Sequence, residues 1–140
     1  MHKIKSIVTI SLCSFLIISC ATARDHCPLV GKWGSNEKAT LVQMEKHGDV
    51  TEKVRSIFLN NFFGKLTLEY TCSEVTSYYK DSLVEKDIRY EIIKKEGNFL
   101  EIEYHTKLLG KITRRITLAG DCYYVPVGGF TFSEVFCRVE

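Results

Sequence analysis

The most reactive side chains of this 140-residue sequence are six cysteines, Cys13, Cys20, Cys27, Cys72, Cys122 and Cys137. A thiol can accept a lipid, form a disulfide, bind a metal or act as a nucleophile. The cysteines form no C-x-x-C pair, and His26, His47 and His105 are far apart, so no zinc-ligand spacing is present. Motifs of serine hydrolases, metalloproteases and phosphate loops are also absent. We therefore expect no metal, no cofactor and no enzymatic activity.

Residues 1–20 have the three parts of an export signal. Lys3 and Lys5 form a positive segment, and residues 7–18 are uncharged and mostly apolar. A dozen residues are too few to span ~30 Å of hydrocarbon but suit a signal peptide. The segment ends in Leu-Ile-Ile-Ser-Cys, which resembles a lipobox: the small Ser19 gives a peptidase access to the bond before Cys20. We expect the Cys20 thiol to accept lipid and, with further acylation of its amino group, to anchor the chain.

These features predict three segments: a lipoprotein signal peptide (1–19), a lipidated N-terminus and linker (20–28), and one folded domain (29–140). Ala21 after the cysteine favours the periplasmic face of a bacterial outer membrane. The alternative is cleavage after Ala23, because Ala21-Thr22-Ala23 fits the A-x-A rule. That cleavage would release a soluble periplasmic or secreted protein.

Cys13 would leave with the signal peptide and Cys20 would carry lipid, so four cysteines remain. An even number in an oxidising compartment predicts two disulfides. Three pairings are possible. Cys122 and Cys137 lie in the last two expected strands on either side of Gly128-Gly129, which fits a cross-strand disulfide and leaves Cys27 with Cys72.

Without Lys3 and Lys5, which leave with the signal peptide, 17 Lys and Arg balance 17 Asp and Glu. The domain is thus neutral and gives no electrostatic reason to expect nucleic acid as a partner.

Two helices are expected between residues 36 and 63. Ser35 or Asn36 can cap the first, which would end near residue 46; a strand over residues 39–42 is the alternative. The second helix is expected over about residues 51–63, because apolar residues recur there at helical spacing: Val54, Ile57, Phe58 and Phe62. The phenylalanines of this helix would pack on the domain or form a lid.

From residue 65 onward the apolar residues alternate with polar ones, as in strands with one face in water. Turn signals at 97–98, 109–110, 120–121 and 128–129 divide the segment into short strands. Seven strands follow the helices, and the segment ending at Trp33 makes eight. The pattern predicts a mainly β fold: an antiparallel up-and-down barrel or half-barrel of about seven to eight strands, with a helical insertion (about residues 36–63) after the first strand.

Gly31-Lys32-Trp33 precedes this series of strands and Arg138 ends it. This arrangement resembles lipocalin (calycin-type) barrels, in which a G-x-W motif opens the first strand and an arginine near the C-terminus lies over the Trp ring. The central T-D-Y motif is absent and the helical insertion is a departure. The closer likeness is to small lipocalin-like lipoproteins of bacteria, mostly of unassigned function. The resemblance implies that Trp33 and Arg138 close a cup-shaped barrel around a ligand cavity.

Several polar side chains have the parity to face that cavity. Arg114 shares the parity of Ile112 and Ile116, so in a regular strand it points inward. An inward Arg114 could anchor the acidic head of an amphiphilic ligand. A bulge near Arg114-Arg115 would instead turn it outward, and of the two we expect the bulge. The aromatic candidates for a cavity lining, each apolar with one polar tip, are Tyr70, Tyr90, Tyr104 and Tyr124.

Two functions follow as expectations. The first is a barrel that binds a small apolar or amphiphilic ligand at the membrane to which Cys20 anchors it. The second is a protein–protein module of the periplasm, such as a lysozyme inhibitor or an envelope assembly factor. A hollow interior with polar tips would favour the first, and a filled core with an exposed apolar patch would favour the second.

Overall fold

A computed structural model describes residues 26–140 of the chain. Cys20 and both predicted cleavage sites lie outside this range, so lipidation and cleavage stay predictions. The elements in order are β1 (Gly31–Ser35), α1 (Glu37–His47), α2 (Glu52–Leu59), β2 (Leu66–Tyr70), β3 (Glu74–Tyr79), β4 (Ser82–Glu96), β5 (Phe99–Thr106), β6 (Gly110–Ala119), β7 (Cys122–Pro126) and β8 (Ser133–Arg138).

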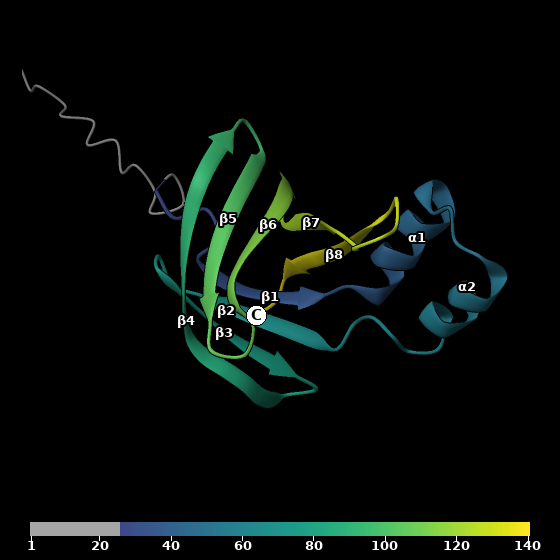
Figure 1. Ribbon diagram of the computed structural model, residues 1–140, viewed down its shortest axis with the longest axis horizontal. Helices are drawn as coiled ribbons and strands as arrows, with labels where there is room; N and C mark the ends of the chain where they lie inside the picture. The colour runs from purple at the N-terminus through teal and green to yellow at the C-terminus, as the bar shows by residue number, and fades with distance from the viewer. Residues whose placement is uncertain (1–25) are drawn as a thin grey trace, which may run out of the picture.

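The eight strands form a closed antiparallel barrel in which each strand pairs with its neighbours in the sequence. The barrel closes where β1 pairs with β8, from Trp33↔Arg138 to Ser35↔Phe136. Figure 1 shows β4, β5 and β6 curving across β1 and β8, with both helices beyond one end of the barrel. The prediction of a mainly β barrel with a helical insertion after the first strand is confirmed.

Helix α1 continues the barrel wall where β1 ends. Its N-cap is Asn36, whose side chain accepts a hydrogen bond from the Ala39 amide at 3.0 Å. The Asn36 amide donates to the Val135 carbonyl at 2.8 Å, and the Val135 amide donates to the buried hydroxyl of Thr40 at 2.9 Å. The helix therefore satisfies backbone groups of β8 that lie beyond its pairing with β1, and the alternative strand over residues 39–42 is wrong.

Helix α2 is shorter than predicted and ends at Leu59. Thr51 caps it, and Asn61 then adopts a left-handed backbone with φ 55°. The turn carries Phe63 back against Phe58, with ring centroids 5.2 Å apart. Burial of Phe63 ends the helix early, because continued helical spacing would not bring its ring to this position.

The apolar interior has two separate parts. One cluster fills the barrel around Trp33, Leu100 and Ile102. The other lies between the helices and the loop before β8, and consists of Met44, Phe58, Phe63 and Phe132. The last strand does not follow the turn at 128–129 directly but begins at Ser133, because Phe130 and Phe132 pack in this second cluster.

One end of the barrel is closed by Trp33 and Arg138. The Arg138 guanidinium lies 4.2 Å from the Trp33 ring centroid and donates to the Val30 carbonyl at 2.7 Å. The indole Nε1–H donates to the Leu29 carbonyl at 2.7 Å, and both Trp33 and Leu29 are fully buried. The contact expected between Arg138 and Trp33 is therefore present. Its hydrogen bonds hold the segment before β1 (residues 26–30, here called the lead-in segment) across the barrel end.

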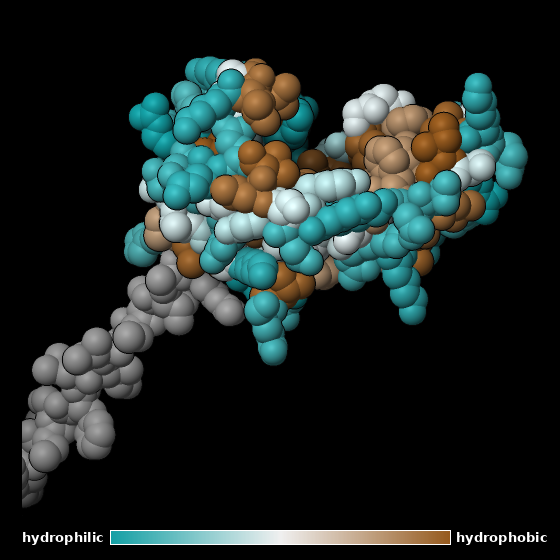
Figure 2. Space-filling model, turned by 90° about the horizontal axis from the view of Figure 1, so that it is seen from below, coloured by the Kyte–Doolittle hydropathy of each residue, from teal (hydrophilic) through white to brown (hydrophobic). Residues whose placement is uncertain are grey.

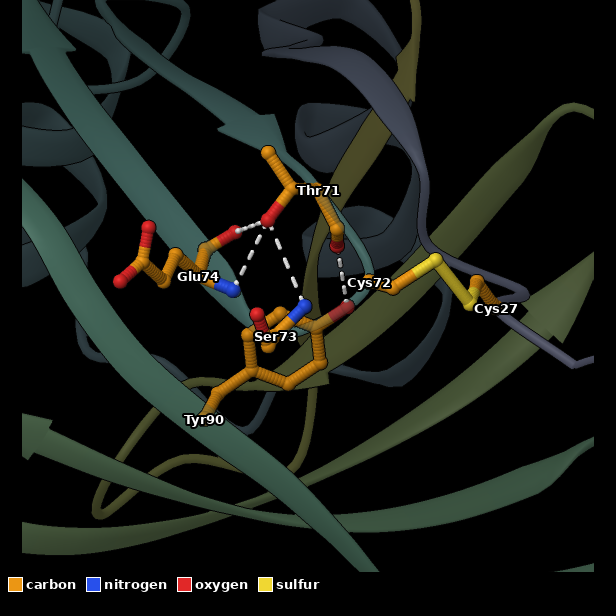
Figure 3. Close-up of a disulfide and its surroundings, with 6 residues drawn as sticks. All are labelled: Cys27, Thr71, Cys72, Ser73, Glu74 and Tyr90. Carbon is orange, nitrogen blue, oxygen red and sulfur yellow. Dashed lines mark hydrogen bonds between the residues drawn. A yellow bond between two sulfur atoms is a disulfide. The ribbon is translucent and has the colours of Figure 1, made fainter.

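Two disulfides hold the strands at this end. Cys122 and Cys137 are directly opposed on β7 and β8, and Cys27 joins Cys72 in the turn between β2 and β3. Figure 3 shows the Cys27–Cys72 disulfide beside Thr71, whose hydroxyl accepts a hydrogen bond from the Glu74 amide at 3.0 Å. The expected pairing is confirmed, and it fastens both the lead-in segment and the last strand.

Gly31 is required by the Arg138 contact, which gives a prediction. Its φ is +123°, and a Cβ there would lie 2.7 Å from Arg138 Nη1. We expect Gly31→Ala to lower the free energy of unfolding by about 1–3 kcal/mol, since it strains the backbone and displaces the guanidinium. Gly128→Ala is the control, because nothing lies within 4 Å of its Cβ position. Equal urea midpoints for Gly31→Ala and the unchanged protein would contradict this explanation.

Candidate functional site

The other end of the barrel is hollow. A cavity of about 460 Å³ opens between the strands and the segment after α2. Figure 2 shows a depression on this side, between the barrel strands at the left and the helical part at the right. Its apolar walls come from β2, β6, β7, β8 and the segment after α2, through Phe62, Phe63, Leu66, Leu68, Ile116, Val125, Val127 and Phe136.

Three tyrosines, Tyr70, Tyr104 and Tyr123, contribute to the cavity lining. The Tyr70 and Tyr104 hydroxyls share a hydrogen bond of 2.9 Å. Tyr123 is 1% exposed, and its hydroxyl has no hydrogen-bond partner among residues 26–140. Burial raises the pKa of all three phenols above the ordinary value. The tyrosines are therefore neutral at physiological pH and offer hydrogen bonds rather than charge.

Tyr70 and Tyr123 are electrostatically coupled, and each affects the pKa of the other. The Tyr123 hydroxyl nevertheless has no hydrogen-bond partner among the described residues. A buried hydroxyl without a hydrogen-bond partner costs free energy.

Two charged residues line the cavity, Arg114 from β6 and Glu134 from β8. Burial raises the pKa of the Glu134 carboxyl, although the Ser35 hydroxyl donates to it at 2.5 Å. Ser35 in turn accepts from the Gly64 amide at 2.9 Å. These bonds connect β8, the end of β1 and the segment after α2, so they fix one wall of the cavity.

Arg114 lies where a regular strand would place it, and the expected bulge is wrong. β5 and β6 pair without interruption from Phe99↔Thr117 to Thr106↔Gly110, with Ile102 opposite Arg114. Ile102 is fully buried inside the barrel, so Arg114 belongs to the inner face. Its side chain is nevertheless exposed, because it lies at the open part of the wall.

Of the four predicted cavity tyrosines, the structure brings only Tyr70 and Tyr104 to the cavity lining. Tyr90 lies deeper, where its hydroxyl donates to the Thr71 carbonyl at 2.6 Å. Burial raises its pKa to about 12, and it is part of the core. The prediction that Tyr124 lines the cavity is wrong. Its neighbour Tyr123 is the buried residue, and the pleat of the strand turns Tyr124 to the other face.

A sequence signal for Tyr123 lies in the pairing of two strands rather than in the pattern of either strand alone. Cys122 pairs with Cys137, and Tyr123 pairs with Phe136 on the opposite face of the sheet. If the disulfide lies outside the barrel, the next pair must lie inside, where the two rings stack 5.2 Å apart. Glu134 was also missed, because a carboxylate beside apolar residues of a strand has no distinguishing pattern.

Comparisons of the chain with models of known families, with curated proteins and with solved structures find no match. The likeness to lipocalins therefore stays a resemblance that rests on Gly31, Trp33 and Arg138. Within residues 26–140, no three His, Cys, Asp or Glu side chains come together as a metal site. Neither helix in that range is long and apolar enough to cross a membrane.

The raised pKa of Glu134 predicts a pH-dependent stability difference. A carboxyl that ionises less readily when folded costs stability above its unfolded pKa of about 4.3. We expect Glu134→Gln to raise the melting temperature at pH 7.5, and the gain to disappear as pH falls below 4. The pKa of Glu103 is lowered by its hydrogen bond to Lys111, so Glu103→Gln should give no gain. A melting temperature of Glu134→Gln at or below that of the unchanged protein at pH 7.5 would refute this.

Proposed function

We propose that this chain is a lipid-anchored binding protein of the bacterial cell envelope whose barrel holds a small apolar or amphiphilic molecule. The observation that carries the proposal is the uneven filling of the barrel. Trp33 and Leu29 fill one end, whereas the other end holds a cavity of about 460 Å³. That volume is within the range of about 300–1,000 Å³ of small-molecule sites.

The chemistry of the cavity lining fits an amphiphilic ligand. Most of its side chains are aliphatic or aromatic, and its polar groups are tyrosine hydroxyls and one residue of each charge. Such a lining favours burial of an apolar chain, at about 25 cal/mol per Å² of surface removed from water. The phenol tips and Arg114 can hydrogen-bond a polar head group.

The membrane part of the proposal rests on the sequence before residue 26. Cys20 follows Leu-Ile-Ile-Ser in a lipobox-like pattern, and five residues separate it from the first described residue. The described domain adds one supporting feature: its four cysteines form two disulfides, as expected of a protein in an oxidising compartment. With zero net charge after removal of the signal, the domain would depend on lipid at Cys20 to stay at an anionic membrane.

A protein partner is the second candidate, and one observation favours it. Ile57, Leu59 and Phe62, in and after α2, are each about half exposed, and Leu108 and Leu109 in the β5–β6 turn are more exposed still. Exposed apolar residues of this kind are typical of partner surfaces. The cavity weighs more in our proposal, because a barrel serving only as a scaffold would be filled.

Mass spectrometry of the protein isolated from its own membrane tests both parts of the proposal. Under denaturing conditions, we expect a mature chain that begins at Cys20 and carries acyl groups. Under native conditions, we expect an additional mass, released on unfolding, from a ligand in the barrel. A chain that begins at Arg24 would overturn the anchor, and native protein without additional mass would contradict the binding function.

Two variants make the native measurement specific to the cavity. Leu68→Trp places a large side chain in the cavity wall and should abolish the additional mass. Ile93→Trp places the same side chain on β4 at a position that is half exposed, and should leave the mass unchanged. Equal retention of the ligand by both variants would place it outside the cavity.

A further inference from the structure

The barrel wall has an opening between β6 and β7. These strands pair only at Thr117↔Tyr124, Leu118↔Tyr123 and Ala119↔Cys122, and residues 110–116 of β6 pair with β5 alone. Continuation of the register would place Pro126 opposite Arg115. Proline has no N–H to donate, which disfavours further pairing. One edge of β6 is therefore free of strand partners over most of its length.

Three cations lie along this part of β6, but one differs from the others. Lys111 and Arg115 are on the outer face and pair with β5 carboxylates, Glu103 at 2.9 Å and Glu101 at 3.5 Å. Arg114 is on the inner face beside Tyr104, and none of the ion pairs within residues 26–140 includes it. Its charge therefore has no acidic partner there.

Two hollows meet at this residue. The internal cavity and a groove of about 470 Å³ on the outer side of the opening share Arg114, Val125 and Pro126 as lining. The groove side is polar, with Glu101, Thr113 and Arg115, whereas the cavity side is mostly apolar, with the tyrosines and Glu134 as its other polar residues. A molecule in the opening would thus meet a cation at the point where its surroundings change from polar to apolar.

We propose that the ligand is a single-chain amphiphile with an anionic head group, and that Arg114 binds this head group in the β6–β7 opening while the chain occupies the cavity. The inference rests on the proposed function and names its ligand class. A guanidinium presents donors in a planar fork that matches the oxygens of a carboxylate or phosphate. An inward-pointing cation on a free strand edge can also discourage aggregation, but that role would give no preference for an anionic head group in the cavity.

The test compares probes that share one chain: decanoate, decyl phosphate and decanol, titrated below their aggregation concentrations at pH 7.5. We expect the full-length protein to bind the anionic probes about tenfold more tightly than decanol. Arg114→Gln should remove that preference and leave the decanol affinity unchanged, which also shows that the variant is folded. Arg115→Gln is the matched control and should keep the preference. A preference for decanoate or for decyl phosphate alone supports the proposal with that head group.

Two results would overturn the inference without affecting the proposed function. One is a decanoate or decyl phosphate affinity that does not change in Arg114→Gln. The other is an equal weakening in Arg114→Gln and Arg115→Gln, which would show a general effect of positive charge near the edge. Failure of all three probes to bind the unchanged protein would instead contradict the proposed function itself.

Discussion

The fold relies on closure of the sheet between β1 and β8. The pairing is short, from Trp33↔Arg138 to Ser35↔Phe136, and each of its ends is reinforced. At one end Arg138 stacks on Trp33 and bonds the lead-in segment, and at the other α1 bonds β8 through Thr40. A closed barrel exposes no strand edge at this seam. Closure also decides what the interior holds, because the large Trp33 ring fills the end where the strands meet.

The opposite end combines incomplete pairing with incomplete filling. β7 pairs with β8 along its whole length but leaves β6 after three residue pairs. The helices cover part of the open end with their own aromatic cluster, so Phe58 and Phe132 pack together instead of filling the barrel. What remains is a cavity lined by apolar side chains, neutral phenols, the Glu134 carboxyl and one inward cation, Arg114. The binding function and its anionic ligand are proposals that follow from this asymmetry.

Much of the fold could be predicted from local patterns. Alternation and turn residues gave the strand number, Asn36 gave the start of α1, and the spacing of Cys122 and Cys137 around Gly128-Gly129 gave one disulfide. The site was harder to predict from the sequence, because the pairing between strands determines which residues face the cavity. Alternation could not choose between Tyr123 and Tyr124, and it could not show that β6 stays regular at Arg114. Likewise, Phe130 and Phe132 continue a strand pattern but pack against α2.

The barrel is filled at its Trp33 end, and we propose that it binds a ligand at the other end. An NMR titration with decanoate of protein labelled with ¹⁵N and in its methyl groups tests it most directly. We expect resonances of Ile116, Val125 and Phe136 to shift together, while the Trp33 indole N–H, bonded to the Leu29 carbonyl, stays unchanged. Shifts confined to the exposed residues Ile57, Leu59, Leu108 and Leu109, with the cavity residues unaffected, would contradict it.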